Sequence, residues 1–203
     1  MEPKRKYQRE LEQLLGTLEG KPRLLLHSCC GPCSSYVLEY LVQFFDITVL
    51  YYNPSIYPEA EYLHRKQVQQ DLIRSMNEKG ASIAFVEGDY DHVSYLELIA
   101  GHEFDPEGGE RCHLCYEQRL RGAATYAALH HFDWYCSTLS VSPYKNAPLL
   151  NELGVKLQGE YGVPWLPSDF KKKNGYKRSI ELSKEYNLYR QCYCGCEFCS
   201  HGG

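Results

Sequence analysis

Residues 23–35 read RLLLHSCCGPCSS, and this stretch decides the fold class. Its first five residues form a short, largely apolar run, which is typical of a buried strand. A Gly-Pro break follows, and helical periodicity then extends over residues 34–45. A second apolar, β-favouring run at residues 47–52 ends at Asn53-Pro54. Together these features predict a β-loop-α-β unit whose strand-to-helix turn carries three cysteines.

Strands and helices continue to alternate beyond this unit. The order predicts one α/β domain over residues 1–203: a Rossmann-like, adenine-nucleotide-hydrolase-like, mostly parallel sheet with helices on both faces. In such folds the site lies beyond the carboxyl ends of the strands. Around the first unit we predict a helix at about 5–18, a helix over 59–78, a strand at 82–86, a helix over 114–130, a strand at 134–137, a helix over 147–161 and a cysteine-rich tail at about 190–203.

Composition and charge exclude several classes of protein. The formal net charge of −4 argues against coating nucleic acid through Lys/Arg contacts to phosphates, although residues 171–178 hold a local run of lysines with Arg178. The N-terminus lacks the continuous apolar region of a signal peptide, and no stretch is long and apolar enough to span a bilayer. We therefore expect a cytoplasmic protein with no membrane partner, in which ten cysteines require metal or redox chemistry.

Two groups of cysteines have the spacing of metal ligands. Cys29, Cys30 and Cys33 occupy a strand-to-helix turn, where the helix N-terminus lowers thiol pKa and favours the metal-binding thiolate. Cys112 and Cys115 form a CxxC at the start of another predicted helix, so that both sulfurs share one helical face. With thiols from the first group, this pair completes the four thiolates that a [4Fe–4S] cluster requires. Four thiolates also suit zinc, so the pattern leaves the metal open.

The tail is open to three interpretations. Residues 191–200 read QCYCGCEFCS, which suits a second metal site, a redox pair or an end without function. A disulfide between Cys194 and Cys196 would close a small, strained ring and would be easily reduced. Elsewhere, Cys136 in an apolar strand is more typical of the core. Asp169, just before the lysine run, is a candidate acid or hard-metal ligand.

Five segments resemble, in order along the chain, the QueH-type epoxyqueuosine reductases. They are CCGPCS at 29–34, RCHLCY at 111–116, CSTL at 136–139, DFKK at 169–172 and YCGC at 193–196. The resemblance spans nearly the whole chain and implies reduction of epoxyqueuosine to queuosine at the wobble position of tRNA, the last step of queuosine biosynthesis. It also implies a [4Fe–4S] cluster on Cys29, Cys30, Cys112 and Cys115, a redox-active disulfide between Cys194 and Cys196, and an adjacent iron whose candidate ligands are Cys33 and Asp169.

The partners implied are the anticodon arm of tRNA and an electron donor that the sequence does not identify. Phosphate contacts and base stacking by residues 171–178 would hold the tRNA. Two other functions remain possible from the residues alone. An ATP-dependent tRNA thiolase or ligase would use the turn at 29–33 as a phosphate loop, but that loop is of the Ser-Gly-Gly type and here it holds thiols. A zinc-stabilised RNA-binding module would use the same thiols structurally.

Overall fold

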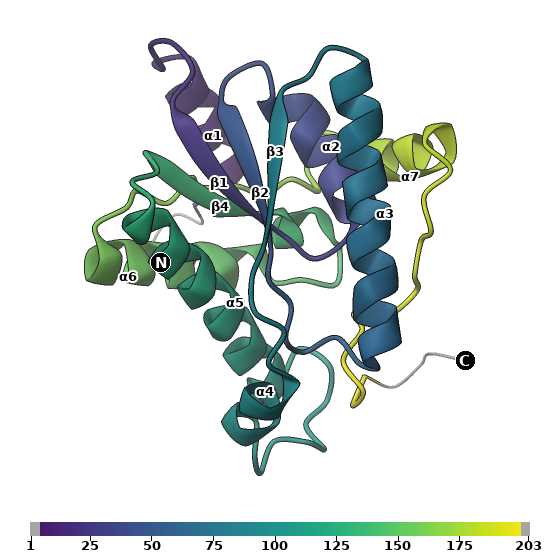
Figure 1. Cartoon of the computed structure of the whole chain (residues 1–203). Helices are drawn as coiled ribbons and strands as arrows, with labels where there is room; N and C mark the ends of the chain where they lie inside the picture. Colours follow the sequence, from purple (N-terminus) through teal and green to yellow (C-terminus); the bar gives the residue numbers. More distant parts are fainter. Residues whose placement is uncertain (1–4, 200–203) are drawn as a thin grey trace.

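The structure, a computed structural model, describes residues 5–199; residues 1–4 and 200–203, which hold the ends of the predicted domain and tail, lie outside the described residues. Within the described range the chain forms one four-stranded parallel sheet in the order β3-β2-β1-β4 (Figure 1). The strands are β1 (Arg23–Ser28), β2 (Asp46–Tyr51), β3 (Ile83–Glu87) and β4 (Trp134–Ser137). The predicted strands and the α/β fold class are therefore confirmed.

The helices follow the predicted alternation with several differences. The helix predicted over 34–45 spans Gly31–Leu41, and the one predicted over 114–130 begins at Glu110. The first helix ends at Leu15, because Gly16 follows it, and is shorter than the predicted 5–18. Two helices were not predicted, α4 and α7, and both are short. The α-helices are α1 (Tyr7–Leu15), α2 (Gly31–Leu41), α3 (Glu59–Glu78), α4 (His92–Leu98), α5 (Glu110–Leu129), α6 (Ala147–Tyr161) and α7 (Gly175–Glu185), and a 3-10 turn, η1, spans Thr138–Val141. No helix within residues 5–199 has the length and apolar character needed to cross a membrane.

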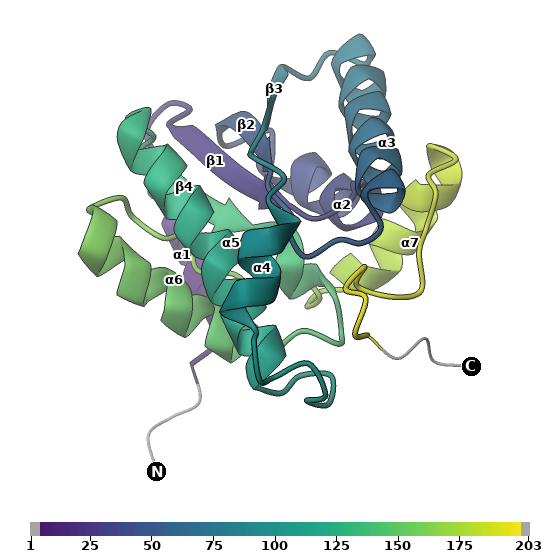
Figure 2. The ribbon, with the colours of Figure 1, turned by 60° about the horizontal axis from the view of Figure 1, so that its bottom comes forward.

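The sheet lies between two layers of helices. Because side chains alternate along a strand, Leu24 and Leu26 of β1 pack with α1, α2 and α3 on one face, while Leu25 packs with α5 and α6 on the other. Figures 1 and 2 show these two layers on opposite sides of the strands. Burial on both faces explains why β1 is a continuous apolar run rather than an alternating one.

The strand order creates a crevice between β1 and β4. From β1 the chain passes through α2 to β2 and β3, and it returns on the other side of β1 as β4. The loops that leave β1 and β4 therefore diverge at the carboxyl edge of the sheet, which is where ligands bind in such folds. His27 of β1 links the segments on either side of its strand: its Nε2 donates to Tyr52 O, in the loop after β2, at 3.0 Å, and its Nδ1 accepts from Ser137 Oγ, at the end of β4, at 2.9 Å.

The cysteine-rich segment returns to the same edge. After α7 the chain runs along α3 and reaches the carboxyl ends of the strands (yellow in Figure 1). Tyr57 N donates to Gly195 O at 2.9 Å, and Arg65 Nη1 of α3 donates to Cys194 O at 3.0 Å. The described part of the tail is thus packed on the domain by main-chain contacts.

Packing of α6 on the sheet edge provides a test of the fold. An added Cβ at Gly154 would overlap the Trp165 ring, whereas one at Gly159 of the same helix meets nothing within 4 Å. We expect Gly154→Ala to lower the free energy of unfolding by about 1–3 kcal/mol, because the ring must shift within a packed core. Gly159→Ala should instead raise it by up to about 1 kcal/mol through helix propensity. Urea denaturation measures both, and equal effects would contradict the packing.

Candidate active site

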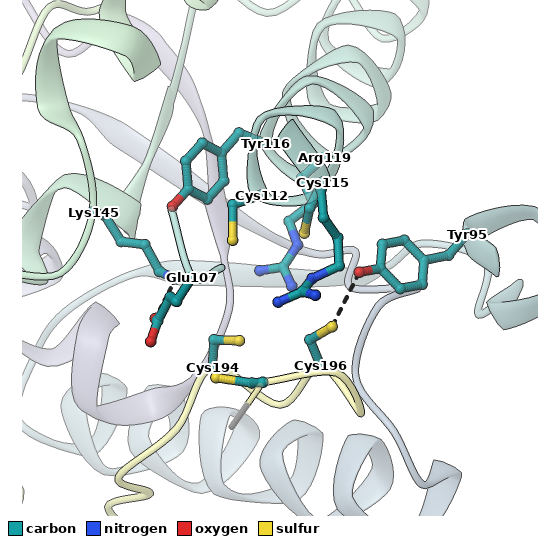
Figure 3. Close-up of a pocket in the computed structure, with 11 residues that line it drawn as sticks. Tyr95, Glu107, Cys112, Cys115, Tyr116, Arg119, Lys145, Cys194 and Cys196 are labelled. Carbon is teal, nitrogen blue, oxygen red and sulfur yellow. Dashed lines mark hydrogen bonds and ion pairs between the residues drawn. The ribbon is translucent and has the colours of Figure 1, made fainter. Parts of the chain in front are cut away.

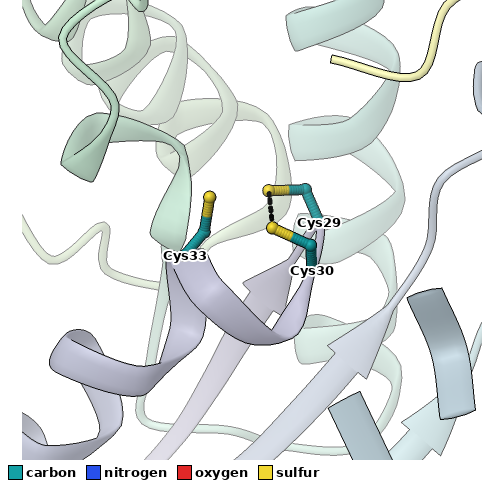
Figure 4. Close-up of side chains that lie close together, drawn as sticks. All are labelled: Cys29, Cys30 and Cys33. Carbon is teal, nitrogen blue, oxygen red and sulfur yellow. Dashed lines mark hydrogen bonds between the residues drawn. The ribbon is translucent and has the colours of Figure 1, made fainter. Parts of the chain in front are cut away.

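Three cysteines meet at the end of β1. The Sγ atoms of Cys29, Cys30 and Cys33 all lie within 4.8 Å of one another (Figure 4), and Cys30 is the residue that caps the N-terminus of α2. The turn is held by Ser28 and Ser34, whose hydroxyls each donate to Gln69 Oε1 at 2.7 Å. The result is a compact, nearly dry thiol group at the carboxyl edge.

The turn also requires a glycine. A Cβ at Gly31 would lie 2.9 Å from Val68 Cγ1 and 3.3 Å from Val68 O, so only a residue without a side chain lets α2 approach α3 so closely. Gly31 thereby fixes the position of the cysteines on either side of it.

The three cysteines of this group differ in pKa. Hydrogen bonds from the thiols of Cys30 and Cys33, reinforced by the positive charge of Arg119, hold the pKa of Cys29 well below its usual value. The same hydrogen bonds raise the pKa of Cys30 to about 12 and the pKa of Cys33 well above its usual value. The surroundings therefore favour the thiolate at Cys29 over Cys30 and Cys33, and a bound metal would displace the remaining protons.

A second group of thiols lines a pocket between α5 and the tail. Figure 3 shows Cys112 and Cys115 projecting from α5 toward Cys194 and Cys196 on the tail. These elements supply sulfur from two sides because the first turns of α5 and the tail meet at the carboxyl edge. The lining residues are Tyr95, Glu107, Arg111, Cys112, Cys115, Tyr116, Arg119, Lys145, Cys194, Cys196 and Cys199.

Polar contacts orient the two cysteines of α5. Gly108 N donates to Cys112 Sγ at 3.3 Å, and the Cys115 thiol donates to Ser55 Oγ at 3.5 Å. Burial raises the pKa of Cys112. Ser55, which follows β2, also accepts a hydrogen bond from Arg119, so that the loop after β2 and the helix α5 are joined at the pocket.

The two cysteines that flank Gly195 differ in charge. A hydrogen bond from Cys199, the positive charges of Lys145 and Arg119, and a backbone N–H lower the pKa of Cys194 to about 5. Burial raises the pKa of Cys196, whose sulfur lies 3.1 Å from the Tyr95 hydroxyl. Gly195 has φ +100°, a conformation that favours glycine. No disulfide joins any of the ten cysteines in this structure.

The thiol groups meet around one arginine. Arg119 is buried, and the negative charges of Cys115, Cys29 and Cys194 raise its pKa. Cys29, Cys30 and Cys112 belong to one packed cluster, whereas Cys115 packs with Cys196 and Cys199. Among the described residues, a group tight enough to hold a metal without rearrangement is found at Cys29, Cys30 and Cys33.

The remaining predicted site residue, Asp169, lies near the loop after β4, and Cys136, which was predicted to be a core residue, lies on β4 itself. Asp169 pairs with Lys171 at 2.9 Å, and the next residue, Phe170, donates its N–H to Ser140 Oγ at 3.3 Å. Cys136 is fully buried, its thiol donates to Leu166 O at 3.4 Å, and burial raises its pKa to about 12. It is a core residue of β4.

Sequence reasoning did not assign the cations of the pocket. Arg119 follows Cys112 and Cys115 by seven and four residues, so the helical repeat of α5 places it on their face and was a usable signal. Lys145 and Tyr95 come from separate segments that only the tertiary fold brings to the thiols. Nothing in the local sequence around them indicates this role.

Comparisons with known proteins agree on one family. The family model described as "Epoxyqueuosine reductase QueH" matches residues 24–201. Curated relatives of that name include one from Staphylococcus epidermidis, 45% identical over 95% of this chain and 83% of its own. Those from Streptococcus pyogenes serotype M1 and Staphylococcus aureus are each 44% identical, over 98% and 95% of this chain and 80% and 82% of their own.

The buried His27 makes the site sensitive to acid. Burial, with the nearby charge of Arg119, lowers the pKa of His27 to about 4, below its ordinary value of 6.5. Between these pH values the unfolded chain binds a proton that the folded chain excludes, so stability is complete above pH 6.5 and is lost as pH falls toward 4. We expect a loss on the order of 3 kcal/mol across this range in the reduced, metal-free protein.

Denaturation at a series of pH values measures this slope. His27→Gln should remove most of it, while His64→Gln, at an exposed position on α3, should leave it intact. A wild-type protein of constant stability from pH 7 to 4 would contradict the assignment of a neutral buried imidazole.

Proposed function

Because this chain belongs to the QueH family of epoxyqueuosine reductases, which are oxidoreductases, we propose that it reduces epoxyqueuosine to queuosine at the wobble position of tRNA. The observation that supports this most directly is the meeting of thiols from the β1 loop, α5 and the tail around Arg119 at the carboxyl edge of the sheet. Such a site combines metal ligands with a redox dithiol, and a reductive removal of oxygen uses both.

The donor set fits an iron–sulfur cluster. Cys29, Cys30, Cys112 and Cys115 are four buried thiols on two rigid elements, and all-thiolate ligation is what [4Fe–4S] clusters use. Hydrogen bonds from its thiol neighbours and the charge of Arg119 favour the thiolate at Cys29, whereas burial raises the pKa of Cys112, so that a bound metal would have to displace its proton. A cluster held there would supply single electrons, and Cys33 and Asp169 are the candidate ligands for an adjacent iron, which would add Lewis acidity toward the epoxide oxygen.

The tail dithiol, Cys194 with Cys196, would supply the electrons and protons that the reduction consumes. Loss of the epoxide oxygen as water consumes two electrons and two protons, and oxidation of Cys194 and Cys196 to one disulfide releases two of each. Lys145 and Arg119 favour the thiolate of Cys194, which is the form that reacts, and the Cys196 sulfur lies 3.1 Å from the Tyr95 hydroxyl. A cellular electron donor then returns the disulfide to the dithiol.

The lysine segment is the proposed contact for the anticodon arm. Lys171 pairs with Asp169, Lys173 with Glu12, and Arg178 with Glu39 and Glu185, so part of its charge is already balanced. Exposed ion pairs contribute little to stability and exchange readily for phosphate contacts. Lys172 and Lys177 are exposed and form no ion pair with any residue in the range 5–199. They are therefore the cations most available to tRNA.

Anaerobic purification with iron, sulfide and zinc analysis, followed by assay on epoxyqueuosine-containing tRNA, tests this function. We expect about four iron and four sulfide per chain, or slightly more iron, and conversion to queuosine. Cys29→Ser and Cys115→Ser should each lose most of the iron and the activity. Cys194→Ser should keep the iron but lose sustained turnover, and Cys192→Ser, at an exposed position outside the pocket, is the matched control. Zinc without sulfide and an inert protein would favour the zinc-stabilised module instead.

The tRNA contact is tested by charge reversal. Lys172→Glu with Lys177→Glu should weaken tRNA binding at least several-fold at low salt and reduce its dependence on salt, because fewer counterions are released. Lys156→Glu, on α6, reverses a lysine that is already paired with Glu117 and should change binding less. Fluorescence anisotropy with labelled tRNA measures both. Equal affinities for the two variants would remove the role of this segment.

A further inference from the structure

Arg119 is a buried cation without a carboxylate partner. It is 4% exposed, Nη2 donates to Ser55 Oγ, and Nε is buried with no hydrogen-bond partner among residues 5–199. Two other arginines of α3 and α5 are neutralised: Arg65 by Glu61 at 2.7 Å, and Arg121 by Glu117 and Glu160. Burying an unpaired charge is strongly destabilising. The pocket is therefore built to receive negative charge.

The residues that line the pocket include more cations than carboxylates. Among the described residues that line the pocket, Arg111, Arg119 and Lys145 are cationic and Glu107 is the one carboxylate. Glu107 lies 3.8 Å from Lys145, and the Asp105 carboxylate accepts the backbone N–H of Arg111 and lies near its charge, whereas Arg119 forms no ion pair with any residue in the range 5–199. Arg111 directs its guanidinium to the carbonyl oxygen of Glu103. Arg119, one helical turn after Cys115 (Figure 3), is thus the cation left to balance the sulfur atoms.

Resting on the proposed function, we infer that Arg119 is the counter-charge of the iron–sulfur cluster and sets its reduction potential. Four thiolates outweigh the positive charge of the iron–sulfur core, so the assembled group is anionic, and one-electron reduction increases its negative charge. A fixed cation in a site of low dielectric stabilises the reduced form more than the oxidised form. Arg119 therefore acts on the cluster through its charge, and it makes the reduction potential of the cluster less negative.

The position of Arg119 supports this role. Its charge acts on Cys115 of α5, on Cys29 of the β1 loop and on Cys194 of the tail, which belong to three separate segments of the chain. The hydrogen bond to Ser55 anchors the guanidinium, so its charge does not relax away when the cluster changes state. A lysine on the surface, screened by water, has no comparable effect.

The test is a spectroscopic redox titration of the anaerobically loaded protein, following the reduced cluster by electron paramagnetic resonance. We expect Arg119→Gln to lower the equilibrium constant for reduction about tenfold, a shift of about 59 mV to more negative potential for one electron. Arg119→Lys keeps the charge and should shift it less. Arg121→Gln removes an exposed, paired cation two residues further along α5 and should leave the potential unchanged.

Each outcome decides the inference. A loaded Arg119→Gln protein with the wild-type potential overturns it. If the Gln variant loses its cluster while the Lys variant keeps it, the charge itself is required and the inference stands. Loss of the cluster from both variants means that the shape of the guanidinium matters rather than its charge, which overturns it. Cluster uptake by the wild-type protein is measured before any variant is made. If the wild-type protein takes up no cluster, the proposed function itself is refuted.

Discussion

The strand order constrains everything else in this molecule. Because β4 returns on the opposite side of β1 from β2, the segments that leave β1 and β4 must separate at the carboxyl edge, and a crevice opens there without any special sequence. His27 of β1 links the loop after β2 to the end of β4, and Gly31 lets the following helix start close to α3. The thiols of the β1 loop, the first turns of α5 and the tail all reach the crevice because the backbone brings them there.

The chemistry of the crevice follows from a balance of buried charge. Thiols in a dry environment resist ionisation, and isolated cations there are costly. The thiolates and the cations stabilise each other. Arg119 and Lys145 favour thiolates at Cys29 and Cys194, and the sulfur charges keep the two cations protonated. Removal of one partner therefore disturbs several others, so that effects of single substitutions in this pocket will not add.

The fold was predictable where the sequence is strongly patterned. Apolar runs such as residues 23–27 and 47–52 are buried on both faces and were recognised as strands, and the long helix at 59–78 was recognised by its period. The seven-residue α4 has too few turns for a period to emerge, whereas the 11 residues of α7 carry a helical period that the reading of residues 171–178 as a lysine run passed over, and α1 was overextended past Gly16. Clustered cysteines indicated the site, but Lys145 and Tyr95 join it only through long-range packing, which local patterns do not encode. The pairing of Asp169 with Lys171 likewise depends on the loop after β4.

The contact between Arg65 and the carbonyl of Cys194 joins residues 129 positions apart in the chain. During synthesis on the ribosome, the sheet and α5 can form before residue 194 exists, and the pocket then lacks the wall that the tail provides. Closing so long a loop adds an entropic cost that only the completed contacts offset. The thiols of the β1 loop and α5 would thus stay accessible on a partly made chain, and docking of the tail would come afterwards as the step that covers them.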